Sequence, residues 1–194
     1  MPPKIKYTRD EIISAACELV RQGGIEKATA RAVAKALDSS PKVIFGAFDG
    51  MDDLKDGVIA MAGELYGEYV RNEMATNRFP PYKSMGMAYI RFAAEEKELF
   101  KLLFMRDRMG DFAPKHEGEL EPVIDVIMNA TGLDEETARL FHLELWITVH
   151  GIASMVATGY MEFDWELISR VLTDSYQGAL HCIKEKNNDS NKNL

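Results

Sequence analysis

The sequence predicts an all-α fold of about nine helices, and three observations support this prediction. Apolar residues recur at helical spacing along nearly the whole chain, and no segment alternates apolar and polar residues as a strand does. The breaks between these periodic segments contain the glycine, proline and aspartate residues that end helices. No repeat with a period of about 20 to 50 residues is present, which argues against a solenoid.

The composition is that of a folded protein with one or two domains. The 194 residues are 46% hydrophobic and 28% charged, which is enough apolar material for a core. Cys17 and Cys182 are too few for a disulfide framework, so we expect a cytoplasmic protein with reduced thiols. The sequence has no run of about 18 apolar residues that predicts a membrane span. We expect neither a metal site nor a cofactor.

Charge is unevenly distributed along the chain. The net charge is −8, but residues 1–48 carry eight basic and five acidic side chains, a local net charge of +3. The rest of the chain therefore carries a net charge of −11. A basic N-terminal segment on an acidic body indicates that only this segment would meet a polyanion such as DNA.

Two short helices are predicted before residue 38. The first begins after Thr8, which has the spacing of a capping box with Glu11, and it ends at Gly23-Gly24. The second begins after Thr29 as its N-cap. The first helix is expected to turn inward the apolar residues Ile12, Ile13, Ala16, Leu19 and Val20, and the second Val33, Ala36 and Leu37.

A third short helix and a longer fourth helix follow. Asp38 to Pro41 is a strong break, with Ser40 as N-cap and Pro41 in the first helical position. Ile44 and Phe48 anchor the third helix, and the fourth covers about residues 53–75. The inward residues expected of the fourth helix are Leu54, Val58, Met61, Leu65 and Tyr69.

The clearest boundary in the chain is Asn77 to Pro81, which contains two consecutive prolines. Helical segments are expected after it at about 82–95, 97–108, 119–131, 134–159 and 164–186. We therefore expect a first domain at 1–52, a connecting helix at about 53–75, a larger helical domain at 76–186 and a disordered tail at 187–194.

Three short helices, the second and third joined by a polar turn of four residues, are typical of a helix-turn-helix, although a plain helical bundle shares the pattern. The residues that narrow this choice are Gly23 or Gly24, Thr29, Val33-Ala34, Ser40, Ile44-Phe45, Phe48 and Leu54. In this order and spacing they resemble the N-terminal domain of the TetR family of bacterial transcription regulators. The resemblance extends without a gap from Thr8 to about Val58. It implies a ligand-responsive, sequence-specific regulator, expected to be a repressor, whose partner is double-stranded DNA.

The start of the third helix would read DNA. In a helix-turn-helix, the N-terminal residues of the recognition helix reach base edges in the major groove, and Lys42 is the candidate for a guanine or phosphate contact. Lys4 and Lys6 would add backbone contacts as a flexible arm. The complete expected set is Thr29, Arg31, Ser39, Ser40, Pro41, Lys42, Phe45, Gly46 and Lys55.

Several positions depart from the family pattern. Phe45 stands where the family usually has a tyrosine that hydrogen-bonds a phosphate, Ala47 replaces a frequent histidine, and Met51 replaces a lysine, for which Lys55 is a substitute. Asp38 replaces the turn glycine but tolerates the left-handed conformation. Fewer phosphate contacts weaken DNA binding and reduce its salt dependence. The alternative is therefore a TetR-like dimeric sensor of a small molecule or partner with weakened DNA binding.

The acidic body is rich in methionine and aromatic residues, which form either a core or an adaptable apolar pocket. Trp146 to Gly151 resembles the Trp-x-x-x-His-Gly signature of one TetR-type C-terminal domain. His142, Trp146 and His150 lie on one face of this predicted helix, and in one interpretation that face adjoins a cavity for a small apolar effector. In the alternative interpretation, the histidine is a hydrogen-bonded core residue and Gly151 permits a close helix crossing. The expected pocket residues are Tyr89, Phe92, Phe104, His142, Trp146 and His150.

The resemblance also implies a homodimer in which the last two long helices of each subunit form a four-helix interface. Its two-fold symmetry would place two recognition helices on a near-palindromic operator, and ligand binding would change their separation. An enzyme that uses His142 or His150 is disfavoured because no nucleophile elbow, phosphate loop or HExxH motif is present. The expected interface residues are Ile152, Met155, Val156, Leu167, Ile168, Val171, Leu172, Tyr176 and Leu180.

Overall fold

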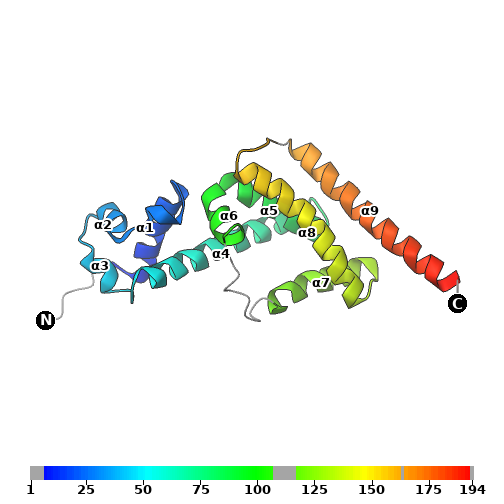
Figure 1. Cartoon of the computed structure of the whole chain (residues 1–194), viewed down its shortest axis with the longest axis horizontal. Helices are drawn as coiled ribbons and strands as arrows, with labels where there is room; N and C mark the ends of the chain where they lie inside the picture. Colours follow the sequence, from blue (N-terminus) through cyan, green and yellow to red (C-terminus); the bar gives the residue numbers. More distant parts are fainter. Residues whose placement is uncertain (1–6, 107–116, 163, 193–194) are drawn as a thin grey trace. The chain divides into compact units, whose positions relative to one another are not determined.

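The computed structural model describes residues 7–106, 117–162 and 164–192, and in these ranges the chain is helical and contains no strand (Figure 1). The predicted all-α class with nine helices is confirmed for the described residues. The α-helices are α1 (Arg9–Arg21), α2 (Ala30–Ala36), α3 (Lys42–Phe45), α4 (Met51–Ala75), α5 (Pro81–Glu95), α6 (Lys97–Phe104), α7 (Glu117–Thr131), α8 (Glu135–Ala157) and α9 (Trp165–Lys192).

The contacts divide the chain into two compact units. Unit 1 contains the described residues up to Glu68 together with Glu95–Arg106. Unit 2 contains Tyr69–Ala94 and the described residues after 106. The division falls inside α4 and assigns α6 to unit 1, whereas the sequence placed the domain boundaries near residues 52 and 76.

Unit 1 packs α2 and α6 against α1. The α6 helix is held to α1 by the ion pair of Arg21 with Glu96, whose Nε–Oε2 distance is 2.8 Å, and by the fully buried Leu99 and Phe100. Helical periodicity alone does not reveal this assignment, because α5 and α6 follow each other in the sequence as two ordinary apolar-periodic segments. Fully buried side chains of unit 1 include Ile12, Val20, Val33, Ile44, Leu54, Val58, Leu99 and Phe100.

Local helix signals were mostly correct in unit 1. Thr8 forms the predicted capping box with Glu11, and the Thr29 side chain caps α2. The expectation that Ala36 faces inward was wrong. Val33 and Ala34 are the buried residues of α2. Ala36 follows Ala34 by two residues, which is a rotation of about 200° around the helix axis, so it faces solvent. At α3, Pro41 and not Ser40 occupies the N-cap position, and no side chain caps the helix.

Unit 2 has its core between α7, α8 and α9. Ile124, Ile127 and Phe141 are its largest fully buried side chains in this region, and Tyr82 and Tyr176 pack against them. The α9 helix continues to Lys192, beyond residue 186 where the sequence placed its end. By length and composition alone, α8 is the one helix of the described ranges that could cross a membrane, a test that core helices of other proteins also pass.

Candidate functional site

The turn between α2 and α3 is short and is closed by backbone hydrogen bonds. Asp38 adopts a φ of 46°, the left-handed conformation that the sequence allowed for this position. The backbone N–H groups of Asp38 and Ser39 donate to the carbonyl oxygens of Lys35 and Ala34 at 3.1 and 2.9 Å. Asp38 thus replaces a turn glycine without opening the turn.

One side of α3 is open to solvent. Ile44 is fully buried and Phe48 nearly so, and they anchor the helix to unit 1. Lys42 and Gly46 are exposed on the opposite side, and the Phe45 side chain is 58% exposed. The solvent-facing side of α3 therefore presents one basic and one aromatic side chain.

The α2 N-terminus offers further donors beside α3. The Thr29 Oγ1 accepts a hydrogen bond from the backbone N–H of Ala32 at 3.2 Å, so its own proton is available for a phosphate oxygen. Arg31, two residues after Thr29, is also exposed. Lys55 Nζ lies 3.5 Å from the Asp52 carboxylate, which competes with any phosphate for its charge. Lys4 and Lys6 lie outside the described residues.

A clamp that the sequence analysis missed positions α3. The Arg9 guanidinium donates to both Asp53 carboxylate oxygens at 3.1 and 2.9 Å and to the Ala47 carbonyl oxygen at 2.6 Å. It also lies 4.1 Å from the centroid of the Phe48 ring. One side chain of α1 therefore holds both the end of α3 and the start of α4.

The Asp53 carboxylate completes this clamp. It accepts a hydrogen bond from the backbone N–H of Asp49 at 3.0 Å, in the turn between α3 and α4. Hydrogen bonds from Arg9 and then from Asp49 lower the pKa of Asp53 to about 2. Tyr7 acts similarly on α2, where its hydroxyl donates to the Leu37 carbonyl oxygen. No local pattern reveals these pairs, because their members lie 30 or more residues apart.

In unit 2, two tyrosines of α5 pair with two histidines of α8. Tyr82 Oη lies 3.0 Å from His142 Nδ1, and Tyr89 Oη lies 2.9 Å from His150 Nδ1. Burial lowers the pKa of both histidines, which favours the neutral imidazole. The Trp146 ring stacks on His150 with a centroid distance of 4.8 Å. These rings join α5 to α8.

The six predicted pocket residues are not all brought together. Tyr89, His142, Trp146 and His150 lie along the α5–α8 contact, as described above. Phe92 is fully buried and packs edge-on against Tyr69 at 5.4 Å. Phe104 was misplaced: it lies in unit 1, because α6 packs on α1, and its ring contacts Tyr66 at 5.3 Å.

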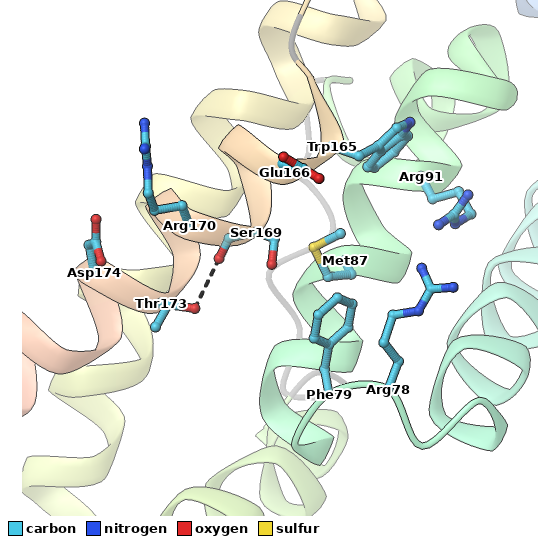
Figure 2. A pocket seen from close by; sticks show the side chains of 10 residues that line it. All are labelled: Arg78, Phe79, Met87, Arg91, Trp165, Glu166, Ser169, Arg170, Thr173 and Asp174. Carbon is cyan, nitrogen blue, oxygen red and sulfur yellow. Dashed lines mark hydrogen bonds between the residues drawn. The ribbon is translucent and has the colours of Figure 1, made fainter.

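A cleft of about 610 Å³ lies elsewhere in unit 2, between the N-terminal half of α9 and α5 with the segment before it (Figure 2). None of the six predicted pocket residues lines it. Among the described residues, no group of three or more histidine, cysteine or acidic side chains is placed to hold a metal ion. The lining residues are Arg78, Phe79, Met87, Arg91, Trp165, Glu166, Ser169, Arg170, Thr173 and Asp174.

The predicted interface residues divide by burial. Ile152, Ile168 and Leu172 are buried within unit 2 itself, so their surfaces are already used inside one subunit and they are removed from the candidate interface. Met155, Val156, Val171, Tyr176 and Leu180 are half-buried, and Leu167 is exposed. The apolar side chains that α8 leaves in solvent are different ones, Leu140, Leu143, Trp146 and Ile147.

Two family models match the chain. Residues 12–57 match the model described as bacterial regulatory proteins of the tetR family. Residues 82–175 match the model described as a tetracyclin repressor-like C-terminal domain. The two matches agree in family and lie in the order expected of one regulator.

Individual proteins that are similar to this chain agree with the two family matches. The chain is 25% identical over 162 residues to an uncharacterised helix-turn-helix-type transcriptional regulator of Mycobacterium tuberculosis, covering 81% of this chain and 73% of that protein. A TetR family protein from Vibrio parahaemolyticus superposes with a TM-score of 0.62 at 16% identity, covering 87% and 96% of the two chains. The multidrug binding protein EbrR in complex with imidazole has a TM-score of 0.60 at 23% identity, covering 86% and 93%. These structural likenesses concern the fold.

Proposed function

Because the chain belongs to the TetR family of bacterial transcriptional regulators, we propose that it represses transcription in the cytoplasm as a homodimer bound to a near-palindromic operator. The single observation that carries this proposal is the open side of α3. Lys42, Phe45 and Gly46 face solvent there, on a helix anchored by Ile44 and clamped by Arg9. A recognition helix needs this combination of a rigid base and an exposed, basic reading surface.

Dimerisation is proposed through α8 and α9. Leu140, Leu143 and Ile147 are 55%, 49% and 59% exposed and lie three and four residues apart, so they form one apolar stripe on α8. A stripe of this kind is costly to leave in water and fits the isologous contact of a two-fold dimer. This replaces Ile152, Ile168 and Leu172 as the centre of the interface.

The effector is proposed to act on unit 2. The pairs Tyr82–His142 and Tyr89–His150 connect α5 to α8, and Trp146 stacks on His150. A small apolar molecule that separates these rings would shift both helices. Such a ligand changes DNA affinity only if it binds one arrangement of the dimer better than the other.

The test is selection of duplexes from a random DNA library by the full-length protein at physiological salt. We expect enrichment of a near-palindrome, and loss of the enrichment in Lys42→Ala. Arg71→Ala, which removes an exposed basic side chain of unit 2, is the control and should enrich the same sequence.

A second candidate function is a dimeric sensor with weakened DNA binding. Phe45 favours it, because an exposed phenyl ring cannot donate a hydrogen bond to a phosphate. If the folded, dimeric protein enriches no sequence, the repressor proposal fails and the sensor function is supported.

A further inference from the structure

The cleft between α5 and α9 combines basic, hydroxyl and apolar side chains in a way that the proposed function leaves unexplained. Its volume of about 610 Å³ is that of a small-molecule site, for which about 300–1,000 Å³ is usual. Phe79 and Met87 lie at its centre, facing Ser169 on α9, and Trp165 closes one end (Figure 2). Side chains of this kind provide an apolar wall for a ligand.

An uncompensated positive charge lies against this wall. Lys83 Nζ donates to Ser169 Oγ at 2.8 Å and to Thr173 Oγ1 at 2.7 Å, and it lies 4.6 Å from the centroid of the Phe79 ring. All three partners line the cleft, and all are neutral. Desolvation lowers the pKa of Lys83, as expected for an ammonium that has no carboxylate partner among the described residues.

Two arginines add to this charge from the α5 side. Arg78 is exposed at the cleft and forms no ion pair with any residue of the described ranges. Arg91 lies 4.8 Å from the centroid of Trp165 and 3.5 Å from the Glu73 carboxylate, which offsets its charge. Figure 2 shows Arg170 and Asp174 directed away from Phe79 and Met87, so they contribute little at the centre.

A hydroxyl donor completes the site. Ser169 Oγ accepts from Lys83, and within the described part of the chain no acceptor for the Ser169 hydroxyl proton is present. The Thr173 hydroxyl, by contrast, donates to the Ser169 carbonyl oxygen at 2.9 Å. Ser169 therefore offers one unused, charge-polarised O–H group in the cleft. Glu166 also lines the cleft and brings one negative charge to it.

We propose that this cleft binds an organic anion, in which an aromatic or other apolar body carries a carboxylate or sulfonate group. The anionic oxygens interact with Arg78 and Ser169, in the field of Lys83, and the body packs on Phe79, Met87 and Trp165. A chain of net charge −8 repels anions at long range, so such a basic cleft has to act at contact distance. The site is separate from the Tyr–His contacts, and the proposal does not depend on DNA binding.

The test compares two fluorescent probes that share one ring system, anilinonaphthalene sulfonate and the uncharged N-phenylnaphthylamine. Full-length protein without DNA is titrated with each probe, and calorimetry gives the number of sites per chain. We expect one saturable site for the sulfonate and an affinity at least about tenfold higher than that of the neutral probe, the gain from one charge-assisted hydrogen bond. Equal affinity for the two probes would overturn the proposal.

Variants locate the binding site. Arg78→Gln should weaken sulfonate binding about tenfold and leave the neutral probe unchanged. The matched control is Arg71→Gln, which makes the same change of charge in the same unit outside the cleft and should keep the original affinity. Equal losses in both variants, or no loss in Arg78→Gln, would contradict the proposed site. Ser169→Ala is a second variant for the same comparison should Arg78→Gln lose helical content.

Discussion

At the scale of single residues, the surface of α3 depends on a few side chains whose roles are separable. Lys42 and Phe45 lie on the open side, whereas Arg9 and Asp53 hold the helix from behind. The positions of Lys42 and Phe45 could be predicted from the sequence, because the start of a recognition helix follows from the turn before it. The pairing of Arg9 with Asp53 could not be predicted, because no local pattern connects two residues 44 positions apart.

Restoring a hydroxyl to the exposed ring should strengthen DNA binding. In Phe45→Tyr the new group reaches solvent from a ring that is already 58% exposed, so it is available to a phosphate at no packing cost. We expect operator affinity to rise about threefold to tenfold, the worth of one hydrogen bond, as measured by fluorescence anisotropy. An unchanged affinity would mean that position 45 does not lie against the DNA backbone; Tyr160→Phe, at an exposed tyrosine of unit 2, is the control.

The clamp predicts a specific acid sensitivity. The Asp53 pKa is about 2 in the folded protein, below its usual value of about 3.9, so its stabilising contribution is complete above about pH 4 and is lost as the pH falls towards 2. The difference in unfolding free energy between the original protein and Asp53→Asn should therefore shrink over this window in urea titrations. Asp52→Asn, at the neighbouring and 97% exposed carboxylate, should show no such convergence. A constant difference for Asp53→Asn would contradict the clamp.

At the scale of elements, α1 and α4 approach each other at a glycine. A Cβ atom added to Gly57 would lie 2.7 Å from Ile13 Cδ1 and 2.9 Å from Ile13 Cγ1. Ile13 is buried and β-branched, so it has little freedom to move away. Gly57 therefore lies mid-helix because it permits close packing, a reason that helix propensity alone does not reveal.

Two alanine substitutions in α4 test this packing. Gly63→Ala meets no atom within 4 Å and should raise the unfolding free energy by about 1 kcal/mol through helix propensity. Gly57→Ala gains the same propensity but overpacks Ile13, so it should be less stable than Gly63→Ala by about 1–3 kcal/mol. Urea denaturation of both variants measures the difference. Equal stability would show that α1 and α4 are not in tight contact.

The elements themselves were largely predictable, because helix starts and turns depend on neighbouring residues. Thr8, Thr29 and Asp38 each adopt the local structure that the sequence indicated. The grouping of elements was not predictable: α6 joins unit 1 through Arg21 and Glu96, a contact between residues 75 positions apart. The cleft was missed for the same reason, since Lys83 reaches Ser169 and Thr173 from a distant helix.

At the scale of the whole molecule, α8 exposes four large apolar side chains to solvent in a single subunit, Leu140, Leu143, Trp146 and Ile147. Ile152, which the sequence placed in the dimer interface, is buried in its own subunit, whereas Leu143 and Ile147 are exposed. Periodicity marks a helix as apolar but does not say which of its apolar sides meets its own chain and which meets a partner. We propose that the remaining side, with Leu143 and Ile147, meets the partner subunit.

A double charge substitution tests this interface. Leu143→Glu with Ile147→Glu should convert the dimer to monomer, because two carboxylates per subunit would be desolvated in the contact. Sedimentation velocity measures the change, and circular dichroism checks the fold. Leu120→Glu, at an exposed leucine of α7, should remain dimeric. A double variant that stays dimeric would place the interface elsewhere.

The proposed function requires the dimer to recognise a DNA sequence through α3 of each subunit. The most direct measurement is the ratio of affinities for the selected operator and for a scrambled duplex of the same composition, at physiological salt. We expect a ratio of at least about 10³, as is usual for specific regulators, and a fall of about tenfold or more in Lys42→Ala, the effect of losing one good base contact. A ratio near one, from protein shown to be folded and dimeric, would contradict the claim.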